Sequence, residues 1–309
     1  MRIIVTGGAG FIGSHVADAL VARGDEVLVV DNLSSGLKEN VNPEVRFEPV
    51  DICDFPKLEK IFRDFRPEAV FHLAAHIDLR ESFRDPAYDA QNNIVGSLNL
   101  LELMAEFGTR KIIFSSTGGA IYGEADKIPT PETYFAIPAS PYGISKLAVE
   151  HYLSVWRKLH GIEYVALRYA NVYGPRQGGK GESGVIAIFA KKMLKGEPIE
   201  IFGDGKQTRD YVYVADVVAA NLAAEELGGS GVFNIGTGIE TSVNEIYEKL
   251  FQLLKCTIPS SKAPAVKGEI LRSVLDYSKA KRELNWEPRV SLGTGLEKTV
   301  DYFKKLTNS

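Results

Sequence analysis

Residues 2–13, RIIVTGGAGFIG, place a glycine-rich turn directly between an apolar strand and an amphipathic helix. We expect the strand over Arg2–Val5 and the helix over Gly13–Arg23. The apolar run EVLVVD at Glu26–Asp31 is typical of a second strand and completes a compact βαβ unit. A glycine pattern in this setting predicts a parallel sheet with a dinucleotide at its edge.

Three glycines of the turn have separate tasks in such a site. Gly7 permits a tight turn, Gly10 lets backbone amides approach a diphosphate, and Gly13 lets helix and strand pack closely. A phosphate loop of the NTPase type is excluded, because Ser14 follows Gly13 where a lysine is required. The turn residues expected to contact a cofactor are Gly7, Gly10, Phe11, Ile12 and Gly13.

Asp31 indicates which dinucleotide binds. It stands 18 residues after Gly13, where a carboxylate can hold the ribose hydroxyls of adenosine. A 2′-phosphate would be repelled, and no arginine follows in the next ten residues to receive one. The sequence therefore predicts NAD rather than NADP. Further cofactor contacts are expected at Asn32, Asp51, Ile52, Leu73, Ala74 and Ala75, although a solvated turn at Asp51 and core packing at Leu73–Ala75 explain those residues nearly as well.

The rest of the amino-terminal half alternates strands and helices, which predicts a doubly wound parallel sheet covered on both faces. From about Gly174 the pattern becomes irregular and glycine-rich. We therefore expect a Rossmann domain over residues 1–173 and a smaller mixed α/β substrate lobe over 174–309, with a segment near 212–240 returning to the sheet through Val232–Ile235. The strands are expected over Val45–Val50, Ala69–Leu73, Lys111–Ser115 and Tyr164–Leu167, and the helices over Phe55–Phe65, Tyr88–Phe107 and Pro141–His160.

Composition excludes several partners. The 309 residues carry a net charge of −4 with no basic block, which argues against nucleic acid or an anionic membrane as a partner. No apolar run is long enough to span a membrane, and no basic-then-apolar leader is present. Cys53 and Cys256 are the only cysteines, so a reduced, cytoplasmic protein is expected. His72 and His76 straddle a strand end without a following acid, so no metal is expected.

Tyr142 and Lys146 stand four residues apart at the start of an expected helix, which Ser140 and Pro141 begin. A tyrosine acts as a base at neutral pH only if nearby positive charge lowers its pKa from near 10 by roughly 3 units, and a lysine one turn away is a candidate source. The first pair follows a strand that ends in Thr117, at the edge of the sheet where ligands bind.

The same spacing occurs once more, at Tyr277 and Lys281. That second pair follows no glycine turn and no strand-end hydroxyl. Its setting therefore favours chance over chemistry.

The chain resembles the extended short-chain dehydrogenase/reductase superfamily and, within it, the UDP-glucose 4-epimerases. The resemblance implies that Tyr142 takes the proton of the sugar 4-hydroxyl, that Lys146 holds the nicotinamide ribose, and that Thr117 shares the proton path. It further implies cofactor contacts at Asn93, Ser115 and Tyr169. The motifs that carry it are Thr6-Gly7-x-x-Gly10-x-x-Gly13, Tyr142-x-x-x-Lys146, residues 168–175 (RYANVYGP), Gly203-Asp204-Gly205 and residues 209–214 (RDYVYV).

Gly118 and Gly119 separate this chain from relatives with other chemistry. Sugar-nucleotide 4,6-dehydratases carry an acid pair after the threonine, and UDP-glucuronate decarboxylases usually a glutamate. Two glycines can neither donate nor accept a side-chain proton, so elimination has no catalyst there. What remains is reversible hydride transfer at one carbon, with NAD tightly bound.

In the second lobe, the resemblance implies that Asn171 contacts the diphosphate, Phe202 stacks on uracil and Arg209 pairs with phosphate oxygens. An ion pair with Asp210 or Asp216 is the plainer role for Arg209, and Asp216 is also expected to cap a helix over Val217–Leu227. Ser273 stands at a gate beside the sugar 2-position, so room for an N-acetyl group is expected. Val185 and Glu269 complete the expected substrate contacts, Glu269 at the uridine ribose.

The chain departs from the family pattern at two places. Val266–Lys267 replaces an arginine and a proline, and either Lys267 or Arg272 could substitute for that arginine. Ile77 stands where some epimerases have a lysine near the diphosphate.

Two other functions stay open: a nucleotide-sugar reductase or dehydrogenase with exchangeable NAD, and a non-catalytic nucleotide-binding regulator. The resemblance also implies a homodimer that pairs the helices near Asn92–Phe107 and Pro141–His160.

Overall fold

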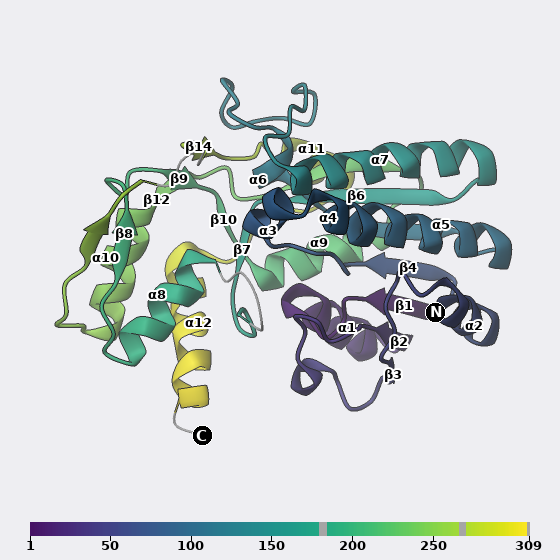
Figure 1. Ribbon diagram of the computed structural model, residues 1–309, viewed down its shortest axis with the longest axis horizontal. Helices are drawn as coiled ribbons and strands as arrows, with labels where there is room; N and C mark the ends of the chain where they lie inside the picture. The colour runs from purple at the N-terminus through teal and green to yellow at the C-terminus, as the bar shows by residue number, and fades with distance from the viewer. Residues whose placement is uncertain (179–183, 266–269, 308–309) are drawn as a thin grey trace.

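A parallel sheet of seven strands forms the centre of the larger part of the molecule (Figure 1). The computed structural model describes residues 1–178, 184–265 and 270–307. The strand order is β11-β6-β5-β4-β1-β2-β3, and all six pairings are parallel. The strands are β1 (Arg2–Thr6), β2 (Glu26–Val30), β3 (Arg46–Glu48), β4 (Ala69–His72), β5 (Lys111–Thr117), β6 (Glu163–Tyr169) and β11 (Gly231–Ile235).

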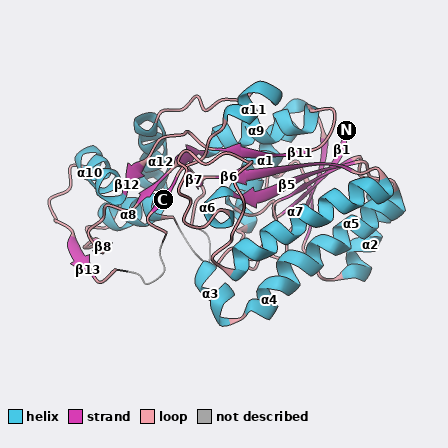
Figure 2. Cartoon of the chain, turned by 90° about the horizontal axis from the view of Figure 1, so that it is seen from above, coloured by secondary structure: helices cyan, strands magenta, loops and turns pink. Residues whose placement is uncertain are grey.

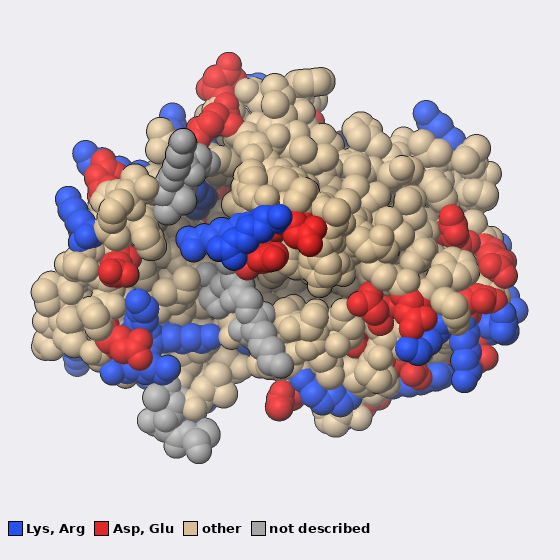
Figure 3. Space-filling model, in the orientation of Figure 1, with Lys and Arg blue, Asp and Glu red and all other residues tan. Residues whose placement is uncertain are grey.

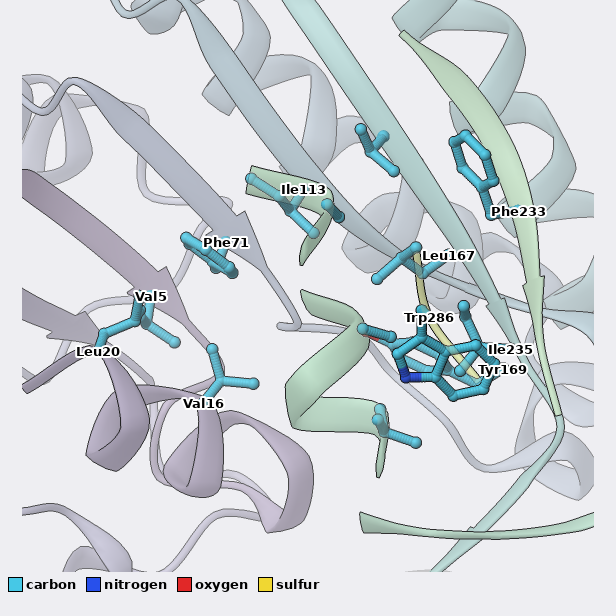
Figure 4. Close-up of a cluster of buried hydrophobic side chains, with 14 of the residues drawn as sticks. Val5, Val16, Leu20, Phe71, Ile113, Leu167, Tyr169, Phe233, Ile235 and Trp286 are labelled. Carbon is cyan, nitrogen blue, oxygen red and sulfur yellow. The ribbon is translucent and has the colours of Figure 1, made fainter. Parts of the chain in front are cut away.

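Helices cover both faces of this sheet (Figure 2). One face packs on α1 (Phe11–Arg23), α9 (Val214–Glu226) and α11 (Ser278–Glu283), and the other on α2 (Phe55–Phe65), α5 (Gly96–Phe107) and α7 (Pro141–His160). The central strands are largely apolar because both of their faces are buried, whereas the edge strand β3 is short and partly exposed. The expected doubly wound parallel sheet is thereby confirmed. The first core includes Val5, Val16, Leu20, Phe71 and Trp286 (Figure 4), and the second includes Leu58, Phe62, Leu100 and Val149.

A third apolar core belongs to the second lobe, where α8 (Val185–Leu194), α10 (Val243–Leu254) and α12 (Leu292–Thr307) pack together. Short sheets border it. They pair β7 (Asn171–Tyr173) with β10 (Tyr211–Tyr213), β8 (Glu200–Phe202) with β13 (Ser261–Ala263), and β9 (Thr208–Arg209) with both β12 (Thr241–Ser242) and β14 (Arg272–Ser273).

Several short helical segments complete the chain: the 3-10 turn η1 (Lys38–Asn40), the helices α3 (Leu79–Arg84), α4 (Pro86–Ala90) and α6 (Gly118–Ile121), and the π-helical turn η2 (Gln91–Val95). The helix expected over Tyr88–Phe107 is therefore built of three consecutive pieces, α4, η2 and α5.

Helix starts show where local sequence determines structure. α2 and α7 have the expected bounds, because the Asp54 and Ser140 side chains accept hydrogen bonds from the third residue beyond them, at 3.3 and 3.1 Å. The expectation for Asp216 is wrong. Tyr213 is the N-cap of α9, and Asp216 lies in its first turn, where the carboxylate accepts a hydrogen bond from Val290 N at 3.0 Å.

Two segments from the carboxyl-terminal half return to the sheet. The strand expected at Val232–Ile235 is β11, which pairs with β6 at the sheet edge. The second return was not expected from the sequence: α11 and Trp286 pack into the core between the sheet and α9. Among the described residues, no helix has both the length and the apolar character needed to cross a membrane.

Candidate active site

A cleft of about 670 Å³ opens where strands of the large sheet end, a volume suited to a nucleotide ligand. Its described lining comes mainly from the ends of β1, β2, β3, β4, β5 and β6 and the segments that follow them. The start of α7, residues of α4 and η2, and residues 177, 178 and 184 complete it. All the expected cofactor-contact residues line it except Asn93. Segments far apart in the sequence thus meet at one edge of the sheet, as expected for ligand binding in this fold.

The glycine turn brings the backbone of α1 to this cleft. Gly7 adopts φ +71°, and a Cβ atom there would lie 2.6 Å from the backbone nitrogen of Ala74. A Cβ on Gly13 would lie 2.2 Å from the carbonyl oxygen of Gly7, so any side chain would push α1 away from β1. Gly10 is the N-cap and supplies no side-chain cap. The positive end of the helix therefore faces the cleft, which suits a diphosphate.

Asp31 lies at the end of β2 and lines the cleft with a side chain that is almost fully buried. Its two carboxylate oxygens accept hydrogen bonds from Ala9 N at 3.0 Å and Leu33 N at 2.8 Å. Burial raises the pKa of Asp31, and these two hydrogen bonds lower it. Each oxygen keeps a second lone pair, so the carboxylate fits the diol of a ribose as the sequence predicts.

Asn32 and Asp51 approach one another at the same end of the cleft. The Asn32 amide donates to Asp51 Oδ2 at 2.8 Å, while Asp51 Oδ1 accepts from Cys53 N at 2.8 Å. Ile52 is buried and lines the cleft with them. A polar rim above an apolar floor is suited to an adenine base.

Lys146 lies at the opposite end and is 2% exposed. Its ammonium donates to the Ser115 carbonyl oxygen at 2.8 Å and lies 5.9 Å from the centre of the Tyr142 ring. Burial lowers the pKa of Lys146 to about 8, and the negative charges of Asp89 and Glu150 oppose that shift. The lysine thus provides a fixed cation beside Tyr142, at the position that the sequence predicts.

The start of α7 sits close to the end of β5. A Cβ on Gly143 would lie 2.5 Å from the carbonyl oxygen of Ala120, so only glycine allows this approach. One turn beyond Lys146, Glu150 accepts from Ser116 at 2.6 Å and forms a two-bonded ion pair with Arg168 of β6 at 2.9 and 2.6 Å. These buried contacts fix α7 against β5 and β6. Sequence reasoning missed them, because nothing in the local pattern pairs residues 116, 150 and 168.

Thr117 ends β5 and lines the cleft with Asn171 and Tyr142. A Cβ on Gly118 would lie 2.4 Å from a methyl carbon of the buried Leu275. By contrast, a Cβ on Gly119 would have ordinary contacts only, at 3.8 Å from Asn171 Oδ1 and 4.0 Å from Thr117 Oγ1. Packing therefore requires the first glycine, while the second leaves open space beside Thr117.

Other tyrosines near the site are unsuited to act as a base. Burial raises the pKa of Tyr122 to about 12, and burial also raises the pKa of Tyr169. Tyr169 lines the cleft, but its hydroxyl lies 2.8 Å from the amide nitrogen of Asn221. Tyr277 packs edge-on against Trp286 at 6.1 Å, within the core between the sheet and α9. The structure thus places the pair Tyr277 and Lys281 outside the cleft lining.

Buried polar contacts fix the end of β4 and the segment that follows it. His72 lies between Thr6 and Ser97 at 2.7 and 2.8 Å, and burial lowers its pKa to about 3, so it is neutral. Asn93 is 3% exposed and does not line the cleft. Its side chain binds both backbone groups of His76, at 2.8 and 2.9 Å. The Asn93 side chain thus holds this loop, and its neighbour Asn92 lines the cleft. A cofactor contact of Asn93 stays a prediction.

The expected substrate residues of the second lobe are only partly gathered. Arg209 and Ser273 lie side by side on β9 and β14, where the Arg209 side chain donates to Thr208 O at 2.8 Å. Phe202 ends β8 and is 42% exposed. Val185 begins α8 and packs against the core of the second lobe. Of the expected substrate residues that are described, Thr117 and Asn171 line the cleft and these four do not.

Two further expectations concern the basic residues of the second lobe. Glu269 and Lys267 lie outside the described residues. Arg272 binds both carboxylate oxygens of Glu240, at 2.8 and 2.7 Å, so its guanidinium is engaged at the surface.

Asp210 accepts hydrogen bonds from Thr237, Gly238 and Leu275 and thereby links the second lobe to the segment after β11. Within the described part of the chain, no group of three or more His, Cys, Asp or Glu side chains could hold a metal.

The sheet, the glycine turn and the carboxylate after β2 define a dinucleotide-binding protein of the Rossmann class. The chain belongs to the NAD dependent epimerase/dehydratase family, whose model matches residues 3–236.

Individual relatives agree with this assignment. The chain is 42% identical over 310 residues to a UDP-glucose 4-epimerase of Mycolicibacterium smegmatis, with 98% of this chain and 99% of the relative covered. It is similar to a UDP-glucose 4-epimerase of Thermotoga maritima solved with UDP-glucose (54% identity, TM-score 0.98, 99% and 100% of the two chains covered). It is also similar to a Thermus thermophilus UDP-glucose 4-epimerase in complex with NAD (44% identity, TM-score 0.94, 98% and 99% covered).

Proposed function

We propose that this protein is a UDP-glucose 4-epimerase, which interconverts UDP-glucose and UDP-galactose through a transient 4-keto sugar with tightly bound NAD. One observation carries the proposal: Tyr142 and Lys146 share the cleft with Thr117, and the two residues after Thr117 are glycines with no acid to drive elimination. Such a site can move a proton and a hydride at one carbon but has no group to expel water.

The amino-terminal part of the cleft would hold NAD. The α1 turn of Gly10, Phe11, Ile12 and Gly13 would take the diphosphate, and Asp31 the adenosine ribose. Bound NAD supplies a reversible hydride acceptor for the carbon at position 4 of the sugar. Two close approaches support the fit, since a Cβ on Gly7 or Gly13 would collide with nearby backbone and displace the turn that would receive the diphosphate.

Tyr142 would take the proton of the sugar 4-hydroxyl as the hydride leaves, and return it in the reverse direction. The Lys146 ammonium would favour the tyrosinate by its positive charge and hold the nicotinamide ribose. Thr117 would relay the proton between sugar and tyrosine. Asn171 would contact the substrate diphosphate, because it lines the cleft beside Gly119.

The second lobe would bind the UDP part. Arg209 would pair with phosphate oxygens, Phe202 would stack on uracil, and Val185 and Glu269 would complete the site. Ser273 is a small residue beside Arg209, which supports room for an N-acetyl group and thus for UDP-GlcNAc and UDP-GalNAc. We also propose that residues 1–173 with the return near 212–240 act as the NAD domain, and 174–309 as the substrate lobe.

A nucleotide-sugar reductase with exchangeable NAD is the second candidate, because the same tyrosine and lysine could serve net oxidation. Native mass spectrometry of the purified protein distinguishes the two. An epimerase retains about one NAD per chain through gel filtration, since its cofactor is regenerated in each cycle. A reductase releases NAD, and loss of NAD together with net NADH formation would contradict the epimerase.

We propose further that the protein is a cytoplasmic homodimer joined through α5 and α7. Figure 3 shows few charged side chains over the part of the surface where α7 and the adjoining start of α5 lie in Figure 1. Exposed apolar side chains on these elements support the interface: Val95 at the end of η2, and Ile144, Tyr152, Val155 and Leu159 on α7. Light scattering that gives the mass of one chain at micromolar concentration would contradict the dimer.

A further inference from the structure

His76 is a cleft residue to which neither the sequence motifs nor the proposed mechanism give a task. It follows β4 and lines the cleft, and its side chain is 19% exposed. Its Nδ1 atom is buried and has no hydrogen-bond partner within the described part of the chain. Buried polar atoms without a hydrogen-bond partner are rare. The unpaired His76 Nδ1 therefore indicates that His76 changes its hydrogen bonding when a ligand binds.

The nearest charged group to that nitrogen is a buried carboxylate. Asp89 is fully buried, and its Oδ1 lies 3.7 Å from His76 Nδ1. The remaining contacts of Asp89 fix its position: it accepts from Ser145 at 2.5 Å and from Asn93 at 3.0 Å. Asn93 also binds both backbone groups of His76, so the imidazole and the carboxylate are held together by one amide.

The other groups around His76 define its electrostatic setting. On α4, the Tyr88 ring packs edge-on at 5.2 Å from the imidazole. On α7, Lys146 interacts with Asp89 through its charge. Asp78, on the same loop as His76, also lines the cleft. Asp89 thus faces His76 from α4 and would stabilise a positive imidazole, whereas the Asp78 carboxylate accepts a hydrogen bond from Glu81 N at 2.9 Å.

Positively charged side chains are scarce among the described residues that line this cleft. Among its described lining residues, Lys146 is the only lysine or arginine, and its ammonium is engaged with Ser115 O. The lining also includes the acids Asp31, Asp51 and Asp78. Ile77, 50% exposed beside His76, offers no charge. The described lining therefore carries more acidic than basic side chains, and a further positive side chain here would add to the attraction that α1 and Arg209 offer a diphosphate.

We propose that His76, backed by Asp89, becomes the positively charged hydrogen-bond donor to a diphosphate bound in this cleft. The proposal rests on the proposed function, in which two ligands with a diphosphate group bind the protein: NAD and the UDP-sugar. Imidazole is the side chain whose charge ordinarily changes near neutral pH, and a phosphate on one side with Asp89 on the other would favour the charged form. Binding of the diphosphate then takes up a proton.

Isothermal titration of NAD into the full-length protein, after its bound NAD has been removed and its fold checked by circular dichroism, tests this contact. Measured at pH 7 in two buffers of different ionisation enthalpy, such as MOPS and Tris, the heats give the number of protons taken up. We expect a fraction of one proton per NAD in the wild type and none in His76→Gln, whose affinity falls about tenfold. A second arm titrates UDP into the NAD-loaded protein, and the ligand that shows the histidine-dependent uptake identifies which diphosphate His76 contacts.

Two further variants sharpen the test. His76→Gln combined with Ile77→Lys should regain affinity but not proton uptake, because lysine is charged before the ligand arrives. His160→Gln, at the exposed end of α7, should behave as the wild type. Unchanged proton uptake and affinity in His76→Gln for both ligands, with epimerisation intact, would overturn this contact alone. Failure of NAD to bind the wild type would overturn the proposed function and this contact with it.

Discussion

The Lys146 ammonium lies 5.9 Å from the centre of the Tyr142 ring, one turn further along α7, and is anchored at 2.8 Å to the carbonyl oxygen of Ser115 in β5. The anchor holds the charge at the end of the strand that also carries Thr117. A lysine held in this way is a fixed cation rather than a mobile surface group. The chemistry of the site therefore depends on how α7 is docked against β5.

Tyr142→Phe removes the hydroxyl and keeps the ring. We expect turnover to fall at least about 100-fold, the scale of general acid–base catalysis, while NAD stays bound. Tyr277→Phe is the matched control, because Tyr277 also has a lysine four residues later but packs on Trp286 away from the cleft. Equal activity in the two variants would remove Tyr142 from the mechanism.

Burial of Lys146 should appear in the stability of the NAD-free protein. Its folded pKa of about 8 lies below the ordinary 10.5, so the unfolded chain holds this proton more tightly and stability rises as pH increases between these values. From about pH 7.5 to pH 10, the free energy of unfolding of the wild type relative to Lys146→Met should rise by about 2 kcal/mol. Urea denaturation measures the difference, and a flat or falling difference would contradict the assigned burial.

Gly118 and Gly119 should respond differently to alanine. Gly118→Ala sets a methyl group against Leu275 and should destabilise the protein by about 1–3 kcal/mol. Gly119→Ala meets only ordinary contacts and should change stability by less than about 0.5 kcal/mol. Thermal unfolding of the two variants compares them directly, and equal midpoints would show that Leu275 does not fill the space behind Gly118.

Ser273 tests the proposed breadth of the substrate range. Ser273→Tyr should lower the rate with UDP-GlcNAc relative to UDP-galactose by about tenfold or more, because the larger side chain would take the space of the N-acetyl group. Ser273→Ala should leave the ratio unchanged. Assays with both substrates in competition give the ratio of the UDP-GlcNAc rate to the UDP-galactose rate. An unchanged ratio in Ser273→Tyr would show that residue 273 does not limit the space for the N-acetyl group.

The helices, strands and turns of the larger part of the molecule could mostly be predicted, because the residues that determine them are close together in the sequence. The glycine turn, the cap Ser140 and the apolar strands depend on neighbouring residues, so they could be placed before the structure was known. The same applies to Asp31, which follows β2 and lies 18 residues after Gly13. The strand order and the two returns to the sheet follow from tertiary packing and carry weaker signals.

The misses share one cause, which is contact between distant segments. Asp216, expected as a helix cap, binds the backbone of Val290, 74 residues later. The brace between Glu150 and Arg168 likewise joins α7 to β6. Polar residues of this kind look like site residues or caps in sequence, and only their partners show what they do.

The most direct test of the central claim is to incubate the purified, NAD-containing protein with UDP-galactose without added NAD or NADH, and to separate the products by chromatography. The account predicts that UDP-glucose appears until the two sugars reach equilibrium, with no net change in NADH absorbance. Absence of UDP-glucose from a protein shown to contain NAD, or formation of a dehydrated or oxidised sugar in its place, would contradict it.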